Sequence, residues 1–261
     1  IAEELVLDNA AKSRKQGYNM IVGDAFIKEP RYKTRLLHSF MYNIHKIDSY
    51  VFSCGETHDT PRLASREGGK NLSRMLTVLN MFVPNTVPFI NSGQEFYEKQ
   101  PMNLGLDVEP DGKYKLEAND PFYGKLALFD YYAFHYLDKD RWEIPDSLDI
   151  VKNIRKKYLD TITRLNNYYP IGFEHMGINC IGFGYIHKES NILLIFANTE
   201  PFVSTVCNAD LREIRSKAAN YPDNPRLLYS SHNKQQFINR LSMDSRLKLD
   251  LEPGEIIIIE L

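Results

Sequence analysis

The stretch Tyr50–Arg62, with the sequence YVFSCGETHDTPR, decides how the rest of the chain is interpreted. It opens with an apolar run of β-branched and aromatic residues, Tyr50–Phe52, which predicts a buried strand. The polar turn that follows carries His58, Asp59 and Arg62, and α/β barrels place their catalytic groups at such carboxyl ends of strands. The same residues also fit a structural role, in which Asp59 caps the next helix and Arg62 pairs with a carboxylate. The stretch by itself leaves both interpretations open.

Strand and helix patterns alternate on both sides of this stretch. Short apolar runs predict strands, and apolar residues spaced three or four apart predict the helices between them. The expected strands are Ile1–Leu7, Asn19–Phe26, Tyr50–Phe52 and Val87–Asn91, and the expected helices are Asp8–Gln16 and those with the apolar stripes Tyr32/Leu36/Phe40/Ile44/Ile47, Leu72/Met75/Leu76/Leu79/Phe82 and Val151/Ile154/Tyr158/Ile162/Leu165. Repeated strand–helix units of this kind predict a parallel sheet.

The character of the sequence changes at Tyr169-Pro170. Beyond this point short β-rich runs are separated by turn residues, which predicts an antiparallel sandwich. The expected strands lie at Cys180–Ile186, Asn191–Ala197, Phe202–Cys207 and within Gly254–Ile259. We therefore predict two domains, an α/β unit over residues 1–169 and a β-sandwich over residues 170–261.

Composition narrows the classes of partner. The chain has 261 residues, 43% of them hydrophobic and 25% charged, and a formal net charge of −2, which gives no electrostatic case for a nucleic acid or an anionic membrane. No apolar run approaches the roughly 20 residues of a membrane-spanning helix. Its three cysteines, Cys54, Cys180 and Cys207, lack metal-ligand spacing. We expect them to be free thiols, and therefore a reducing, cytoplasmic location.

The chain begins with Ile1 in an expected strand, without an initiator Met. We expect it to be part of a longer protein, so that a signal peptide on that protein is neither visible nor excluded.

Three motifs resemble the α-amylase family of glycoside hydrolases and transglycosidases, glycoside hydrolase family 13. Glu56-Thr57-His58-Asp59 is similar to the Asn-His-Asp motif that follows the seventh barrel strand in that family. Val87–Glu95, VPFINSGQE, resembles the eighth strand with its Gly-x-Glu ending, and Ile1–Leu5, IAEEL, resembles the fifth strand with its acid/base Glu. In the tail, Asn191–Asn198 and Leu251–Glu255 are similar to strands of the family's C-terminal β-sandwich.

This resemblance implies a fold: the second half of a (β/α)8 (TIM) barrel, strands five to eight, followed by an antiparallel β-sandwich domain. It also implies that the family's nucleophilic Asp, on the fourth strand, lies in an N-terminal half that this chain does not contain. One position departs from the family pattern, since Thr57 stands where Asn is usual. Threonine keeps a hydrogen-bonding group with a shorter reach.

The resemblance assigns roles to three residues. Retaining cleavage of a glycosidic bond needs two carboxyl groups about 5 Å apart around an oxocarbenium-like transition state. Glu3 is the candidate acid/base, with Glu4 as its competitor because strand neighbours point to opposite faces. Asp59 is the candidate catalytic carboxylate that stabilises the transition state, and His58 is the candidate for binding the hydroxyls of the same sugar ring.

Other polar residues receive structural interpretations. Arg62 and Glu95 are expected to fix the loops at the rim through ion pairs or hydrogen bonds. His38, His45, His135 and His175 form no metal-ligand pattern, and we predict no metal site and no cofactor. A structural calcium ion is left open for the missing part.

Three functions remain in view. The first is a retaining enzyme acting on α-glucans or maltooligosaccharides, either a hydrolase or a 4-α-glucano/maltosyltransferase. The second is a non-catalytic binding or partner subunit with the same fold, and the third is an unrelated α/β enzyme with an appended sandwich. We expect the 261 residues alone to be inactive, because the double displacement would lack its nucleophile.

Overall fold

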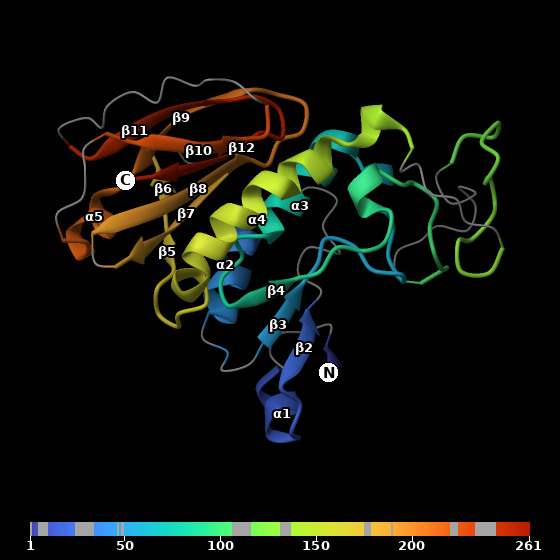
Figure 1. Cartoon of the computed structure of the whole chain (residues 1–261), viewed down its shortest axis with the longest axis horizontal. Helices are drawn as coiled ribbons and strands as arrows, with labels where there is room; N and C mark the ends of the chain where they lie inside the picture. Colours follow the sequence, from blue (N-terminus) through green and yellow to red (C-terminus); the bar gives the residue numbers. More distant parts are fainter. Residues whose placement is uncertain are drawn as a thin grey trace.

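A parallel sheet forms the N-terminal part of the protein in the computed structural model, which describes residues 2–4, 10–23, 34–45, 47, 50–105, 116–130, 137–174, 179–188, 190–219, 224–232 and 244–261. Its strands are β1 (Ala2–Glu4), β2 (Met20–Gly23), β3 (Tyr50–Ser53) and β4 (Thr86–Pro88), which pair in chain order. The helices α1 (Ala10–Lys15), α2 (Thr34–Ile44) and α3 (Gly69–Asn80) connect them, and α4 (Glu143–Ile162) follows β4. The predicted alternation of strand and helix is therefore present (Figure 1).

The strands are shorter than the sequence suggests. The strand expected at Val87–Asn91 is β4, which ends at Pro88. Backbone pairing continues for one step, since the N–H of Phe89 donates to the carbonyl of Ser53 at 2.9 Å. The side-chain amide of Asn80 then donates hydrogen bonds to the carbonyl of Phe89, at 3.2 Å, and to that of Ser53, at 2.8 Å. A side-chain amide from α3 therefore replaces the next strand bonds.

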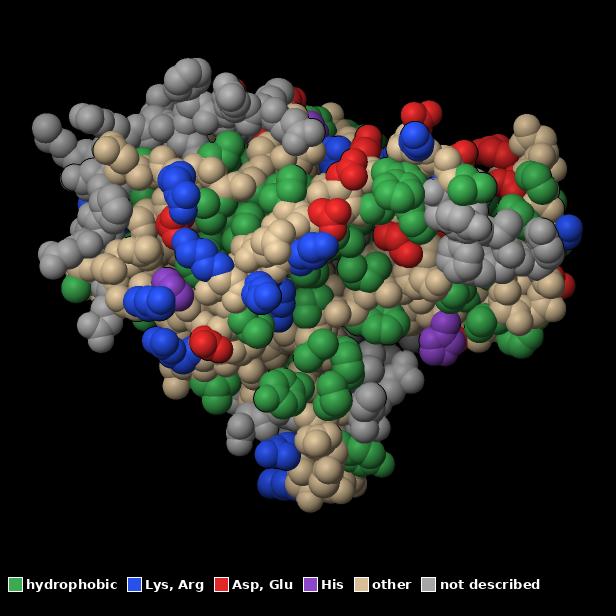
Figure 2. All heavy atoms as spheres, viewed as in Figure 1, with side chains coloured by type: hydrophobic (Ala, Val, Ile, Leu, Met, Phe, Trp, Pro, Cys, Tyr) green, Lys and Arg blue, Asp and Glu red, His purple; other side chains and the backbone are tan. Residues whose placement is uncertain are grey.

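One face of the parallel sheet packs on the helices. Val51 in β3 is fully buried in a core with Met41 of α2 and Leu76 of α3. Tyr50, which we predicted to be buried, is 59% exposed, because neighbouring strand residues point to opposite faces and this face of β3 is uncovered in the described part of the chain. Figure 2 shows hydrophobic side chains gathered on the surface around β3 and β4.

The helices bury apolar stripes of the expected kind. In α3, Leu72, Met75, Leu76 and Leu79 are buried as predicted. In α2 the buried residues are Leu37, Met41 and Ile44, of which Ile44 belongs to the stripe that we expected, and Ile47 after the helix packs partly buried against the same core. The side chains of Leu36 and Phe40 and the whole of Tyr32 lie outside the described residues.

The C-terminal part consists of two antiparallel sheets. The larger has the order β10-β12-β8-β7-β5 and the smaller the order β11-β9-β6. The strands are β5 (Tyr169–Pro170), β6 (Gly172–Phe173), β7 (Cys180–His187), β8 (Asn191–Asn198), β9 (Thr205–Asp210), β10 (Arg226–Ser230), β11 (Arg246–Leu251) and β12 (Ile256–Glu260), with a short helix α5 (Arg212–Lys217) after β9. The strand expected at Phe202–Cys207 starts three residues later, and Phe202 lies exposed in the preceding bend.

The five-stranded sheet is buried on both faces. Along β8 the residues alternate: Leu193 and Ile195 join the core shared with α2, α3 and α4, whereas Leu194 joins the core shared with the three-stranded sheet. The same alternation in β12 divides its isoleucines between the two cores. Burial on two faces explains why both strands are continuously apolar in sequence. The helical layer therefore lies between the parallel sheet and the sandwich (Figure 1).

None of the helices in the described part of the chain is both long enough and apolar enough to cross a membrane.

Candidate active site

A buried ion pair anchors the turn that follows β3. The carboxylate of Glu56 and the guanidinium of Arg62 are both fully buried, and Arg62 Nη1 lies 2.7 Å from Glu56 Oε1. Glu56 also accepts hydrogen bonds from the N–H of Leu63 at 2.6 Å and from the amide of Asn91 at 3.1 Å. Charges this deeply buried persist only when they are paired and hydrogen-bonded. The pair therefore fixes the chain on both sides of the turn.

Arg62 extends this network to the segment after β4. Its Nη1 donates to the carbonyl of Ser92 at 2.7 Å, and its Nε donates to the carbonyl of Gln100 at 2.8 Å. The structural role that we expected for Arg62 is present, with Glu56 as its carboxylate partner. Sequence analysis gave Glu56 no role of its own, because carboxylates are rarely fully buried unless they are paired.

Two threonines shape the turn itself. The N–H of Thr57 donates to Thr60 Oγ1 at 2.8 Å, and the hydroxyl of Thr60 donates to the carbonyl of Thr57 at 3.2 Å. The N–H of Asp59 reaches Thr57 Oγ1 at 3.3 Å. Thr57, the position that departs from the family pattern, is buried, and its hydroxyl oxygen accepts a hydrogen bond from the local backbone. The two residues between the threonines are left at the surface.

His58 and Asp59 lie together at the apex of the turn. His58 Nε2 is 3.2 Å from Asp59 Oδ2, and the side chains are 56% and 32% exposed. The second oxygen, Asp59 Oδ1, accepts a hydrogen bond from Asn103 Nδ2 at 2.7 Å. Each oxygen of this carboxylate is thus engaged on one side while the group remains open to solvent. Such an arrangement holds the carboxyl group in one orientation, where it can meet a ligand.

Asn103 is a site residue that the sequence did not reveal. It lies in an irregular segment, 44 positions after Asp59, where no periodic pattern marks its side chain. Nearby, Gly105 approaches the same turn so closely that an added Cβ would lie 2.4 Å from the carbonyl oxygen of Asp59. Gly105, two residues after Asn103, is the sequence feature that fits such a close approach of two backbone segments.

Glu3 lies in the central position of β1. The strand register aligns it with Val22 of β2, which is aligned with Phe52 of β3, so Glu3 is two strands away from β3. At about 4.8 Å per strand the backbones of Glu3 and Phe52 are about 10 Å apart. Both positions are near the carboxyl ends of their strands, the end from which the His58–Asp59 turn leaves. The side chains of Glu3 and Glu4 lie outside the described residues.

Glu95 has an unusual environment at the end of the β4 segment. Its Oε2 is buried without a hydrogen-bond partner in the described part of the chain. Burial raises the pKa of this carboxyl, and the neighbouring Glu56 carboxylate adds to the effect. The hydrogen-bonding part of the role expected for Glu95 is present, since the backbone N–H groups of Gly93 and Glu95 bond to the carboxyl and partly oppose the rise of its pKa. No group of three or more potential metal ligands is found within the described ranges.

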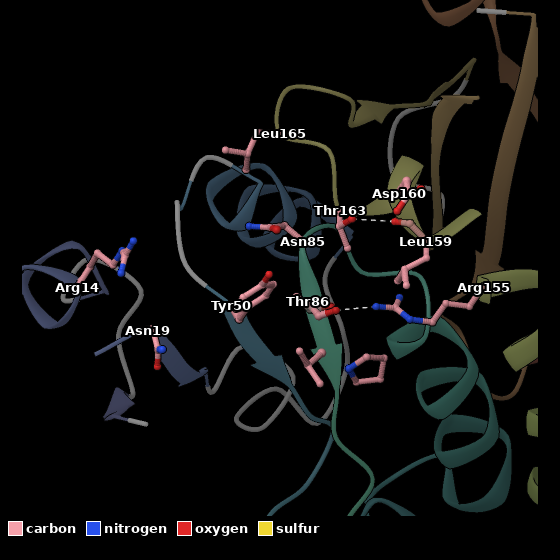
Figure 3. Close-up of a pocket in the computed structure, with 12 residues that line it drawn as sticks. Arg14, Asn19, Tyr50, Asn85, Thr86, Arg155, Leu159, Asp160, Thr163 and Leu165 are labelled. Carbon is pink, nitrogen blue, oxygen red and sulfur yellow. Dashed lines mark hydrogen bonds between the residues drawn. The ribbon is translucent and has the colours of Figure 1, made fainter. Parts of the chain in front are cut away.

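A cavity lies at the opposite end of the parallel sheet. Its volume is about 790 Å³, and Asn19, Tyr50 and Asn85, which line it, precede or begin the strands β2, β3 and β4 (Figure 3). On its far side Arg155 of α4 donates to the carbonyl of Thr86 at 2.6 Å (Figure 3). Because the His58–Asp59 turn follows the other end of β3, this cavity is separate from the candidate active site.

The fold matches part of several solved structures. No family model matches the chain, and no curated protein matches it. An α-amylase from H. orenii matches with a TM-score of 0.63 at 13% identity, and the noncanonic maltogenic α-amylase AmyB from Thermotoga neapolitana with 0.61 at 16%. The α-glucosyl transfer enzyme XgtA matches with a TM-score of 0.58 at 12% identity.

Each of these matches covers 99% of this chain but only 52%, 60% and 50%, respectively, of the solved one. The chain therefore spans about half the length of the proteins that it resembles and has the fold of their C-terminal part.

Proposed function

We propose that this chain forms one side of the active site of a retaining enzyme that cleaves α-1,4-glucosidic bonds of α-glucans or maltooligosaccharides. The observation that carries the proposal is the exposed His58–Asp59 pair, which the buried Glu56–Arg62 pair holds at the carboxyl end of a parallel sheet. The fold likeness to an α-amylase, a maltogenic α-amylase and an α-glucosyl transfer enzyme supports the same class of substrate.

The parallel sheet would be strands five to eight of a (β/α)8 barrel. The chain-order pairing of β1 to β4 and the helices between them support this assignment. Parallel sheets are normally covered on both faces, and the helices cover one. The face that carries Tyr50 would then turn toward the barrel interior. Strands of the remaining half would complete the barrel on that side.

Asp59 would act on the charge that develops at the sugar. Positive charge builds up on the ring in the oxocarbenium-like transition state, so an oriented carboxylate stabilises the transition state more than the bound sugar. His58 would bind hydroxyls of the same ring, and Glu3 would protonate the leaving oxygen and later activate the incoming hydroxyl. Water as the incoming group gives hydrolysis, and a second sugar gives glycosyl transfer.

The nucleophile and the groups that tune the acid/base would come from the rest of the protein. Half of the length of the matched structures lies outside the correspondence with this chain, which supports this division of the site. Residues 1–261 expressed alone should then release or transfer no sugar from maltooligosaccharides, while the complete protein does. Saturable turnover by residues 1–261 alone would overturn both the division and the assigned roles.

Replacing Asp59 by Asn in the complete protein tests the central assignment. Removing the charge while keeping the shape should lower kcat for a maltooligosaccharide about 100-fold or more, a magnitude typical of lost transition-state stabilisation. The matched control is Asp149→Asn, since the side chain of Asp149 is 74% exposed in a surface ion pair on α4. Both variants should keep the Tm of the parent.

Each alternative has its own outcome in this experiment. Unchanged kcat in Asp59→Asn would show that Asp59 only shapes the turn. The complete protein could instead bind maltooligosaccharides, with an affinity that falls when Asp59 is replaced, and never release or transfer sugar. That outcome would make it a non-catalytic binding unit of the same fold.

A further inference from the structure

Two cysteines of the sandwich face each other across its two sheets. Cys180 begins β7 in the five-stranded sheet and Cys207 lies in β9 of the three-stranded sheet. Their sulfur atoms are 4.0 Å apart, and each residue is only 2% exposed. The two thiols are therefore in direct contact, although 27 positions separate them in the chain.

The backbone around this pair is held at a corner of the sandwich. Residues 169–173 cross from one sheet to the other, because β5 pairs with β7 and β6 pairs with β9. The N–H of Ile171, between these two strands, donates to the carbonyl of Gly182 in β7 at 2.8 Å. A short continuous segment thus ties β7 to β9 beside the cysteines. The 4.0 Å between the two sulfurs would have to shorten to about 2 Å in a disulfide.

We propose that Cys180 and Cys207 form a redox-sensitive pair that closes to an inter-sheet disulfide in the presence of a low-molecular-weight disulfide such as oxidised glutathione. The pair stays as two thiols under the reducing conditions of a cytoplasm. When the chain folds in the presence of the oxidant, the bond closes a loop between two strands that the fold brings together. The proposal is independent of the function assigned to the His58–Asp59 turn.

The reaction is a pair of thiol–disulfide exchanges. The thiolate of one cysteine attacks a sulfur of oxidised glutathione, which breaks the S–S bond and releases one glutathione thiolate. The second cysteine loses its proton and attacks the protein sulfur of the mixed disulfide, which releases the second glutathione. Two protein thiols are oxidised to one disulfide, and one oxidised glutathione is reduced to two thiols. In the folded protein the contact between the two thiols lowers the pKa of Cys207 and raises that of Cys180.

Counting thiols tests the proposal. The protein is unfolded in urea and refolded in oxidised glutathione, so that burial does not limit access to the sulfurs, and free thiols are then counted with Ellman's reagent in denaturant. Of the three cysteines in residues 1–261 one should remain a thiol, and peptide mapping should link Cys180 to Cys207 with a loss of two hydrogen masses. Cys54→Ser should remove that remaining thiol and keep the same link. Cys180→Ser and Cys207→Ser should each abolish the intramolecular bond.

Thermal unfolding supplies a second readout. A disulfide that closes a loop of this length should raise the Tm of the refolded protein by about 7 °C over the same sample treated with dithiothreitol. The Cys180→Ser variant should show no difference between the two treatments. Folded protein that retains all three thiols, or a link that involves Cys54, would overturn the proposal.

Discussion

Replacing Arg62 by Met should destabilise the protein strongly while leaving the surface of the turn unchanged. Methionine fills much of the same volume but removes the guanidinium, which is fully buried against Glu56. The carboxylate would then lie in the interior with only neutral donors, the N–H of Leu63 and the amide of Asn91. An uncompensated buried charge of this kind is far more costly than a lost surface ion pair.

The contacts of Arg62 set the size of the effect. It makes charge-assisted hydrogen bonds to Glu56, to the carbonyl of Ser92 and to the carbonyl of Gln100, at 2.7, 2.7 and 2.8 Å. Breaking a buried pair on one side lowers the free energy of unfolding by about 3–5 kcal/mol. The free energy of unfolding of a folded protein is about 5–15 kcal/mol in total, so the variant should still fold but lose much of its stability. Glu56→Gln combined with Arg62→Met should destabilise by less than the sum of the two single changes, because no charge remains unpaired.

Urea unfolding followed by tryptophan fluorescence measures these values. The single tryptophan, Trp142, lies at the start of α4 with its ring 6.3 Å from that of Phe96, and it reports on packing between α4 and the segment after β4. The control is Arg212→Met, which removes an exposed ion pair with Asp210 and should leave the unfolding midpoint unchanged. A loss below about 1 kcal/mol in Arg62→Met, or a double variant whose loss equals the sum, would refute the reasoning.

Three further predictions concern pH and the orientation of the carboxylate. Burial lowers the pKa of His38 to about 4, and its Nδ1 lies 2.9 Å from the hydroxyl of Tyr168. The free energy of unfolding should therefore fall by up to about 3 kcal/mol as pH falls from about 6.5 to about 4. Urea titrations of His38→Leu should not show this pH dependence. Burial raises the pKa of Glu95, so the protonated form is favoured in the folded state and stability should fall as pH rises above about 4.5; Glu95→Gln should remove this dependence and raise the Tm at pH 7. Asn103→Ala should lower kcat of the complete protein without changing its Tm, because it frees Asp59 from the 2.7 Å contact; an unchanged kcat would remove Asn103 from the site.

Hydrophobic periodicity predicted most of the helices and strands. It separated the helix α3 and the strands β7, β8 and β12 correctly because each buries a continuous set of apolar residues. It missed β11, although Leu247, Leu249 and Leu251 alternate with charged residues, since a six-residue run is short beside the turns around it. It also predicted Tyr50 to be buried, because a period shows that two faces differ and does not show whether both are covered.

The candidate site was only partly visible in the sequence. His58 and Asp59 are neighbours in the chain, so their proximity needed no tertiary information. The partners that hold them could not be predicted, because Asn103 reaches Asp59 from 44 positions away. A hydrophobicity pattern treats the fully buried Glu56 as it treats an exposed glutamate. Only the pairing of Glu56 with Arg62 in the folded structure distinguishes the two cases. Glu3 keeps its predicted role as a prediction.

The alternating burial along β8 bears on how such a protein can be re-engineered. Leu193 and Ile195 join the core of the helical layer and Leu194 joins that of the smaller sheet, so one face of the five-stranded sheet packs on the N-terminal part of the chain. The sandwich is consequently not a portable module. Grafting it onto another barrel would require matching the underside of α3 and α4 to these side chains, and cutting the chain at Tyr169-Pro170 would bare an aliphatic surface on each piece. Swapping of the C-terminal part between relatives should therefore succeed only when the helices travel with it.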